Sequence, residues 1–223
     1  MRIRKKKHLD ERLEGVKDLV LNPDRDILNV KLAVLDKKYF DFVALFGNDN
    51  KVELEIGCGK GGFINQKAKL NPNVNYIAVE LLQNIIVMAA ENAKKAGITN
   101  VRFVNSGAEY LARYIPEKSI QNIYLNFSPP FPQLGYESRR LTSDWFVNSY
   151  KNFLCDDGAI YQKTDDQEFF LYSKSKFIEH GFMVTDLTEQ LNDSTIDNVE
   201  TEYEQKFRAL GMKVFGLKAT LKS

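Results

Sequence analysis

The sequence predicts an α/β protein in which helices cover both faces of a mostly parallel sheet. From residue 51 onward, short apolar or β-branched runs alternate with segments whose apolar residues repeat at helical spacing. This alternation is typical of parallel strands joined through helices. Hydrophobic residues make up 43% of the 223 residues and include 15 Phe and 10 Tyr, so the chain has ample material for a core.

Seven segments are predicted to be strands because they are short, apolar and mostly end in a turn or polar residue. They are Val52–Ile56, Tyr76–Glu80, Val101–Asn105, Ile120–Phe127, Ala159–Thr164, Phe182–Leu187 and Lys213–Leu221.

Three amphipathic helices lie between these strands. The first has a predicted buried face and ends at Gly97, a residue that suits a helix C-terminus. The second begins after Thr142 or Ser143, either of which is able to cap it. The third ends before Gly181. The three faces comprise Ile85, Met88, Ala89, Asn92, Ala93 and Ala96; Phe146, Tyr150, Phe153 and Leu154; and Phe170, Phe177 and Ile178.

Composition limits the function classes. Lys and Arg total 31 against 30 Asp and Glu, but five of the first seven residues are basic, which favours either contact with an anionic partner or a solvated terminus. Cys58 and Cys155 cannot form a disulfide framework or a zinc site. No apolar run is long enough to span a membrane, so we expect a cytoplasmic protein.

We divide the chain into a basic N-terminal extension with helices, 1–45, and a main domain, 46–223.

A glycine-rich turn follows the first predicted strand. Four of the 13 glycines fall within residues 57–62, and Lys60 lacks the Gly-Lys-Ser/Thr context of a phosphate-binding P-loop. Gly57, Gly59 and Gly62 satisfy the dinucleotide fingerprint, with Glu80 as the acid for a ribose. That match leaves a dinucleotide as one possible ligand.

Glu55 favours a different ligand. A carboxylate two residues before the first glycine opposes a negatively charged pyrophosphate, whereas it suits the sulfonium and ammonium groups of S-adenosylmethionine. Glu80 is able to accept hydrogen bonds from both ribose hydroxyls. The structural alternative is that Glu55 is a buried carboxylate paired with a lysine, because unpaired burial of the charge would be costly.

The sequence resembles the bacterial tRNA (guanine-N7-)-methyltransferase family over almost its whole length. The resemblance rests on the shared order and spacing of short motifs. These are Met1–Arg4, Phe46–Asn50, Leu54–Gly61, Asn75–Glu80, Leu125–Ser128, Arg139–Ser143, Lys163–Asp165 and Thr201–Glu204. It implies a Rossmann-like S-adenosylmethionine-dependent methyltransferase fold with a seven-stranded sheet, and methylation of guanine N7 in the tRNA variable loop.

The resemblance also implies site residues. The cofactor would contact Glu55, Gly57, Gly59, Glu80, Gly107, Ala108 and Asn126. The tRNA would contact Asp165, Thr201, Glu202, Tyr203, Glu204, Arg139 and Arg140. Guanine N7 carries a lone pair and no proton, so its methylation needs alignment rather than a general base.

The sequence departs from the family after the fourth predicted strand. The family pattern there is Asp-Pro-Trp-Pro-Lys followed by a basic stretch that contains a His. The corresponding stretch here runs from Pro129 to Ser138, with Pro129 at the acid position, Gln133 at the Lys position and Tyr136 at the His position. Another family acid, before Ala108, is replaced by Gly107. No catalytic residue is assigned.

Three functions remain open at this point. The protein is an N7 methyltransferase in which the missing groups are auxiliary, or a methyltransferase of exocyclic amines that uses Ser128–Phe131, or an inactive relative that binds tRNA. We expect S-adenosylmethionine as the cofactor, tRNA as the partner, no membrane and no metal. We also expect a monomer or weak homodimer.

Overall fold

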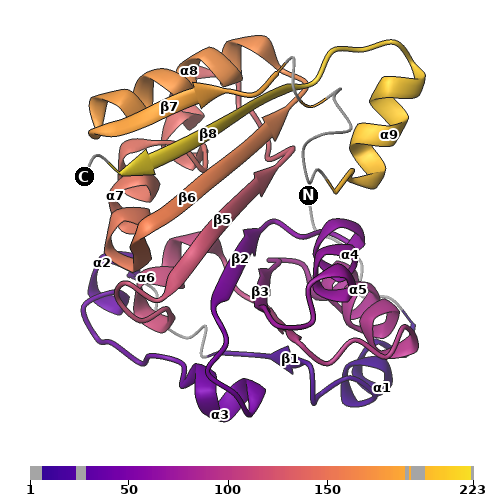
Figure 1. Ribbon diagram of the computed structural model, residues 1–223. Coiled ribbons are helices and arrows are strands. Elements are labelled where there is room, and N and C mark those ends of the chain that lie inside the picture. The colour runs from indigo at the N-terminus through magenta and orange to yellow at the C-terminus, as the bar shows by residue number, and fades with distance from the viewer. Residues whose placement is uncertain (1–6, 24–28, 189–190, 192–198, 222–223) are drawn as a thin grey trace. The chain divides into compact units, whose positions relative to one another are not determined.

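The computed structural model describes residues 7–23, 29–188, 191 and 199–221, without the side chains of residues 202 and 208 (Figure 1). Arg2, Arg4, Lys5 and Lys6 of the basic N-terminus lie outside these ranges. The chain forms two units, residues 1–114 and 115–223, and each is described by itself.

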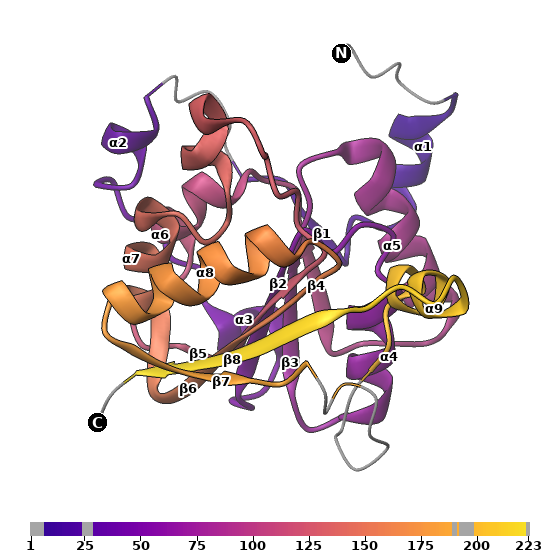
Figure 2. The same cartoon turned by 90° about the horizontal axis from the view of Figure 1, so that it is seen from above.

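The first unit contains four parallel strands in the order β1-β4-β3-β2. Its elements are α1 (Leu9–Glu14), β1 (Val20–Leu21), α2 (Val30–Ala33), α3 (Phe42–Phe46), β2 (Val52–Ile56), α4 (Gly62–Leu70), β3 (Asn75–Val79), α5 (Gln83–Lys95), β4 (Val101–Val104), the 3-10 helix η1 (Ala108–Tyr110) and α6 (Leu111–Tyr114). Helices α4 and α5 pack against β3 and β4, as Figure 2 shows. Every residue of β2 and β3 is buried, as expected for parallel strands covered on both faces.

The second unit contains four strands in the order β5-β6-β8-β7. Its elements are β5 (Ile120–Asn126), the 3-10 helix η2 (Leu134–Arg139), α7 (Asp144–Phe153), β6 (Leu154–Thr164), α8 (Gln167–Glu179), β7 (Phe182–Asp186), α9 (Glu202–Ala209) and β8 (Phe215–Leu221). Strand β5 is parallel to β6, whereas β8 is antiparallel to both of its neighbours. Helix α8 packs against β6, β7 and β8.

The predicted α/β class and all seven predicted strands are confirmed. Their ends shift by up to five residues, since β6 begins at Leu154 and β8 begins at Phe215. Strand β1 was not predicted, because two residues are too few to show a periodicity. No helix in the described ranges has the length and apolar character needed to cross a bilayer.

Two helix faces differ from the prediction. In α5 the buried stripe contains Ile86, Val87 and Ala90, together with the predicted Ala89 and Ala93, while Asn92 is exposed. The apolar run 85–90 surrounds the helix, so its spacing alone is compatible with more than one face. In α8 the predicted core residue Ile178 is 52% exposed.

Candidate functional site

The glycine turn follows β2 in the first unit and has positive φ angles that favour glycine. Gly57 has φ 85° and Gly59 has φ 55°. A Cβ atom at either position would have no neighbouring atom within 4 Å, so the space beside this part of the turn is open. At Gly61, by contrast, a Cβ would lie 2.8 Å from Cβ of Ala89 in α5, which makes Gly61 a packing residue.

Glu80, directly after β3, holds the turn in place. Its Oε2 accepts a hydrogen bond from the backbone N–H of Gly59 at 3.3 Å, and its Oε1 accepts one from the N–H of Leu82 at 2.9 Å. The N–H groups of Gly57 and Cys58 donate to the carbonyl oxygen of Val79. The carboxylate at the end of β3 is therefore part of the turn that follows β2.

Glu55 adds a second carboxylate to this region. It lies in β2 and is 2% exposed. Burial raises the pKa of the Cys58 thiol well above its usual value, and the negative charges of Glu55 and Glu80 raise it further. Because both carboxylates act on one atom of the turn, its surroundings favour a cation and disfavour a pyrophosphate. The residues present thus fit S-adenosylmethionine better than a dinucleotide.

The segment after β4 contains the other two predicted cofactor residues of this unit. Gly107 is buried in an extended conformation, and Ala108 begins η1. A Cβ at position 107 would lie 2.5 Å from Oε2 and 2.6 Å from Oε1 of Glu109. Sequence reasoning missed Glu109, because none of the short motifs includes that position.

In the second unit, β5 ends at the predicted cofactor residue Asn126, and the backbone then turns sharply. Phe127 has φ 50° and Phe131 has φ 42°, both unusual for residues that are not glycine. The Oγ atom of Ser128 is buried and has no hydrogen-bond partner in the described part of the chain. Positive φ angles of this kind cost free energy and occur often at functional sites.

Arg140 fixes the loop that departs from the family pattern. Its guanidinium donates to the carbonyl oxygens of Pro130 at 2.8 Å and Phe131 at 3.1 Å, and lies 4.3 Å from the ring centre of Tyr172 in α8. Burial and the adjacent Glu137 carboxylate raise the pKa of Tyr172 to about 12. These contacts give Arg140 a role within the protein, so contact between Arg140 and a phosphate remains a prediction.

Arg139 is exposed, and its guanidinium lies 4.7 Å from the ring centre of Tyr136. Pro129 and Gln133, at the positions of the family's acid and Lys, are also exposed. Arg139 is therefore an exposed cation in a loop where the family pattern has several.

Asp165 directly follows β6 and is half-buried. In the described residues its carboxylate has no hydrogen bond or ion pair, whereas the next residue, Asp166, caps α8 by accepting from the N–H of Phe169 at 2.8 Å. Within the described residues, the Asp165 carboxylate therefore has no structural role that would prevent it from binding a ligand.

Thr201 and Glu204 have structural contacts. The Thr201 hydroxyl accepts a hydrogen bond from the N–H of Glu204 at 2.9 Å, which caps α9. The Glu204 carboxylate is fully buried and pairs with the Lys163 ammonium at 2.7 Å. Lys163 also donates to the carbonyl oxygen of Val199 at 3.1 Å. Contact between Glu204 and guanine would require this ion pair to open.

An aromatic cluster joins α9 to the end of β5. The ring centres of Tyr203 and Phe207 lie 5.0 Å apart, and that of Phe127 lies 5.5 Å from Tyr203. Tyr203 is 54% exposed, so its ring offers surface to a ligand. Glu202, whose side chain is not described, is the first residue of the same helix.

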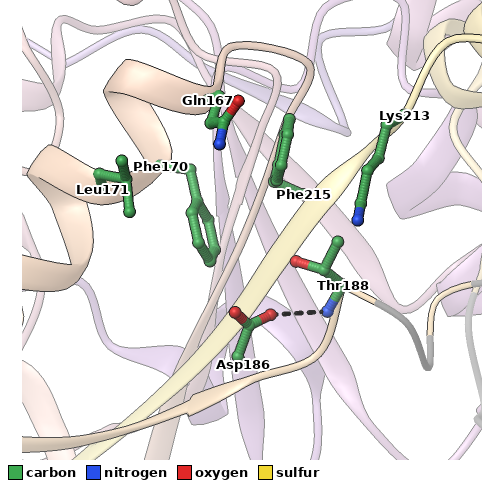
Figure 3. A pocket seen from close by; sticks show the side chains of 7 residues that line it. All are labelled: Gln167, Phe170, Leu171, Asp186, Thr188, Lys213 and Phe215. Atoms are coloured by element: carbon green, nitrogen blue, oxygen red, sulfur yellow. Dashed lines mark hydrogen bonds between the residues drawn. The ribbon is translucent and has the colours of Figure 1, made fainter.

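A separate cavity of about 380 Å³ lies beside α8 and β8 (Figure 3). Phe170 and Phe215 form apolar walls, and the Asp186 carboxylate accepts a hydrogen bond from the N–H of Thr188 at 2.9 Å. None of the site residues predicted from the sequence is among its lining residues. The cavity therefore has no part in the predicted site.

The fold is shared with other methyltransferases. A 30S ribosomal A1408 methyltransferase from an uncultured bacterium superposes with a TM-score of 0.56 at 16% identity, covering 92% of this chain and 99% of that one. The 16S rRNA methyltransferase KamB superposes with a TM-score of 0.59 at 15% identity, covering 84% and 96%. At such low identity the similarity shows the fold alone.

Sequence comparison is more specific. A family model described as "Putative methyltransferase" matches residues 49–217. The tRNA (guanine-N(7)-)-methyltransferase of Geobacillus sp. (strain WCH70) is 43% identical over 172 residues, which are 77% of this chain and 78% of that protein. The protein of the same name from Bacillus velezensis is 40% identical over 190 residues, which are 84% and 88% of the two chains. Because relatives of this name are 40–43% identical over more than three quarters of both chains, this chain belongs to the tRNA (guanine-N(7)-)-methyltransferase family.

Proposed function

We propose that this protein transfers a methyl group from S-adenosylmethionine to N7 of a guanine in the tRNA variable loop. The observation that carries this proposal is the open glycine turn with two carboxylates, Glu55 and Glu80, acting on it. A site of this charge accepts a ligand that is cationic and carries no phosphate. The names of the relatives favour N7 over an exocyclic amine as the methylated atom.

Each group of residues has a defined task in this proposal. The cofactor supplies an electrophilic methyl group on a sulfonium. Glu55 holds the cationic end of the cofactor, and Glu80 accepts hydrogen bonds from the ribose. Gly57 and Gly59 allow close approach, and Gly107, Ala108 and Asn126 complete the proposed contacts.

The second unit would hold the guanine. Asp165 accepts hydrogen bonds from the guanine N1–H and amino group, which adenine does not present in the same arrangement. The exposed Tyr203 ring stacks on the base, supported by Phe207 and Phe127. Methylation at N7 leaves a positive charge on the purine, so a ring face and a carboxylate both favour the product state.

The remaining substrate contacts are also proposals. Arg139 binds a phosphate, while Arg140 keeps the loop after β5 in shape. Thr201, Glu202 and Glu204 act through the position of α9. A cytoplasmic location and a monomeric or weakly dimeric state accompany this function.

The test begins with nucleoside mass spectrometry of tRNA incubated with the purified protein and S-adenosylmethionine. We expect 7-methylguanosine as the product. A methylated exocyclic amine in its place, or no methylated nucleoside, would contradict the proposed reaction.

The cofactor residues are tested separately by calorimetry. Glu55→Gln preserves the shape of the side chain but removes its charge, so we expect the affinity for S-adenosylmethionine to fall at least about tenfold. Glu53→Gln, on the same strand, is the matched control and should bind nearly as well as the wild type. Equal affinities in all three proteins would show that the cofactor is held elsewhere.

A further inference from the structure

Glu109 brings a carboxylate to the place where a side chain at position 107 would begin. Both of its oxygens lie within 2.6 Å of the Cβ that any residue other than glycine would have there. The space next to the Gly107 backbone is thus filled by a carboxylate from two residues further along the chain. Glu109 is half-buried, and its carboxylate has no hydrogen bond or ion pair in the described part of the chain.

The arrangement continues a pattern in the first unit. Strands β2, β3 and β4 are neighbours and parallel, so their carboxyl ends lie at one edge. Glu55 lies near that end of β2, Glu80 follows β3, and Glu109 follows β4. Ligands of open parallel sheets bind beyond the carboxyl ends of the strands. Each of the three strands therefore contributes one carboxylate to the edge where a ligand is expected.

We propose that Glu109 accepts a hydrogen bond from the exocyclic amine of the adenine of S-adenosylmethionine, in place of the acid that the family pattern has at position 107. The inference rests on the cofactor of the proposed function. Two groups of donors on that cofactor, the ammonium and the ribose hydroxyls, are already matched by Glu55 and Glu80. The adenine amine is the remaining donor, and it needs an acceptor.

The experiment moves the carboxylate from one residue to the other. Affinities for S-adenosylhomocysteine are measured by calorimetry for Glu109→Ala, for Gly107→Asp, and for the two changes combined. The backbone at Gly107 has φ −75°, which any residue adopts. A Cβ at position 107 requires the Glu109 carboxylate to move in the single variant, whereas the combined variant removes that carboxylate and leaves room for aspartate. Loss of an acceptor for a charge-assisted hydrogen bond predicts about a ten- to hundredfold weaker affinity for Glu109→Ala. The combined variant should recover most of this loss, because it returns a carboxylate to the same space.

A second ligand identifies the atom that Glu109 recognises. S-inosylhomocysteine lacks the exocyclic amine, so the wild type should prefer S-adenosylhomocysteine and Glu109→Ala should lose that preference. Asp49→Asn, an exposed change in the same unit, is the control. Unchanged affinity in Glu109→Ala, or an equal loss for both ligands, would overturn the proposal.

Two further measurements keep this result interpretable. Circular dichroism melts show whether Glu109→Ala is folded, and Glu109→Gln, with its smaller change, takes its place if it is not. Calorimetry does not depend on methyl transfer. A protein that binds S-adenosylhomocysteine through Glu109 but forms no 7-methylguanosine would refute the proposed reaction and leave this inference intact.

Discussion

The ion pair between Lys163 and Glu204 determines which acidic residues are available to a substrate. Both side chains are at least nine-tenths buried, and their charged atoms lie 2.7 Å apart. Removing one partner of such a pair leaves the other charge buried without compensation, which is more costly than removing both. The carboxylates with freedom to meet a ligand in the second unit therefore include Asp165 but not Glu204.

Unfolding experiments test this assignment. Glu204→Gln should reduce the free energy of unfolding by about 3–5 kcal/mol, because it leaves the Lys163 ammonium buried without a compensating negative charge. The double variant Lys163→Met/Glu204→Gln should recover a large part of that loss. Urea unfolding followed by circular dichroism provides the values. Lys163→Met alone completes the comparison, and a double variant whose loss equals the sum of the two single losses would mean that the pair is not coupled.

The predictability of the site differs from residue to residue. The neighbourhood of Gly59 and Glu80 could be predicted, because one lies in the turn after a strand and the other directly follows the next strand of a parallel sheet. That Glu55, Gly57, Gly59 and Glu80 bind the cofactor stays a prediction. The partner of Glu204 could not be found, since Lys163 is 41 residues away and no periodicity connects the two positions. The same holds for Arg140, whose contact with the ring of Tyr172 depends on how α8 packs.

Among the helices and strands, the beginning of α8 shows most clearly the difference between a side chain that stabilises the fold and one that is available to a ligand. Two adjacent aspartates have different roles there: Asp166 caps the helix, and Asp165 has no partner among the described residues. Side chains before the first turn of a helix either satisfy its free N–H groups or project away from it. Asp166 and Asp165 are therefore suited to a direct comparison, since the first carboxylate stabilises the helix and the second is available to bind the substrate.

Replacing each aspartate should give opposite results. Asp166→Ala should reduce the free energy of unfolding by about 1 kcal/mol through loss of the cap. Asp165→Asn should change it by less than about 0.5 kcal/mol. When the formation of 7-methylguanosine is followed, kcat/KM should fall at least about tenfold in Asp165→Asn and change little in Asp166→Ala. A loss of stability without a loss of activity in Asp165→Asn would remove it from the site.

The strands were more predictable than the helix faces. A fully buried parallel strand appears as a continuous apolar run, and β2 matches its predicted range, Val52–Ile56. A helix must also reveal which of its sides is buried, and the apolar residues at 85–90 cover too much of the circumference of α5 to do so. Tertiary packing decides which side of α5 is buried, and in this structure Ile86 and Val87 are buried while Asn92 is exposed.

For the molecule as a whole, charge distribution is the property that matters most for tRNA. The net charge is only +1, and the loop after β5 has Gln133 and Tyr136 where the family pattern has a Lys and a His, so the basic N-terminus contains an unusual share of the positive charge. We propose that this N-terminus contacts tRNA phosphates. Each such contact releases a counterion and makes binding more sensitive to salt.

A chain without residues 1–6 tests this proposal. It lacks Arg2, Arg4, Lys5 and Lys6, so the slope of log affinity for tRNA against log salt should become shallower by up to about 3.6, or about 0.9 per lost contact. The affinity for S-adenosylmethionine should not change. The full-length chain with glutamine at those four positions controls for length. An unaltered slope in both proteins would show that the N-terminus is solvated.

The antiparallel strand β8 also determines when the sheet of the second unit is completed during translation. It pairs with both β6 and β7 but is synthesised after both of them. During translation, β7 lacks its only partner in the described sheet and β6 has an open edge until residues 215–221 appear. Unpaired strand edges promote association between nascent chains. We therefore expect the first unit to fold during synthesis, whereas the second depends on chaperones until β8 is synthesised.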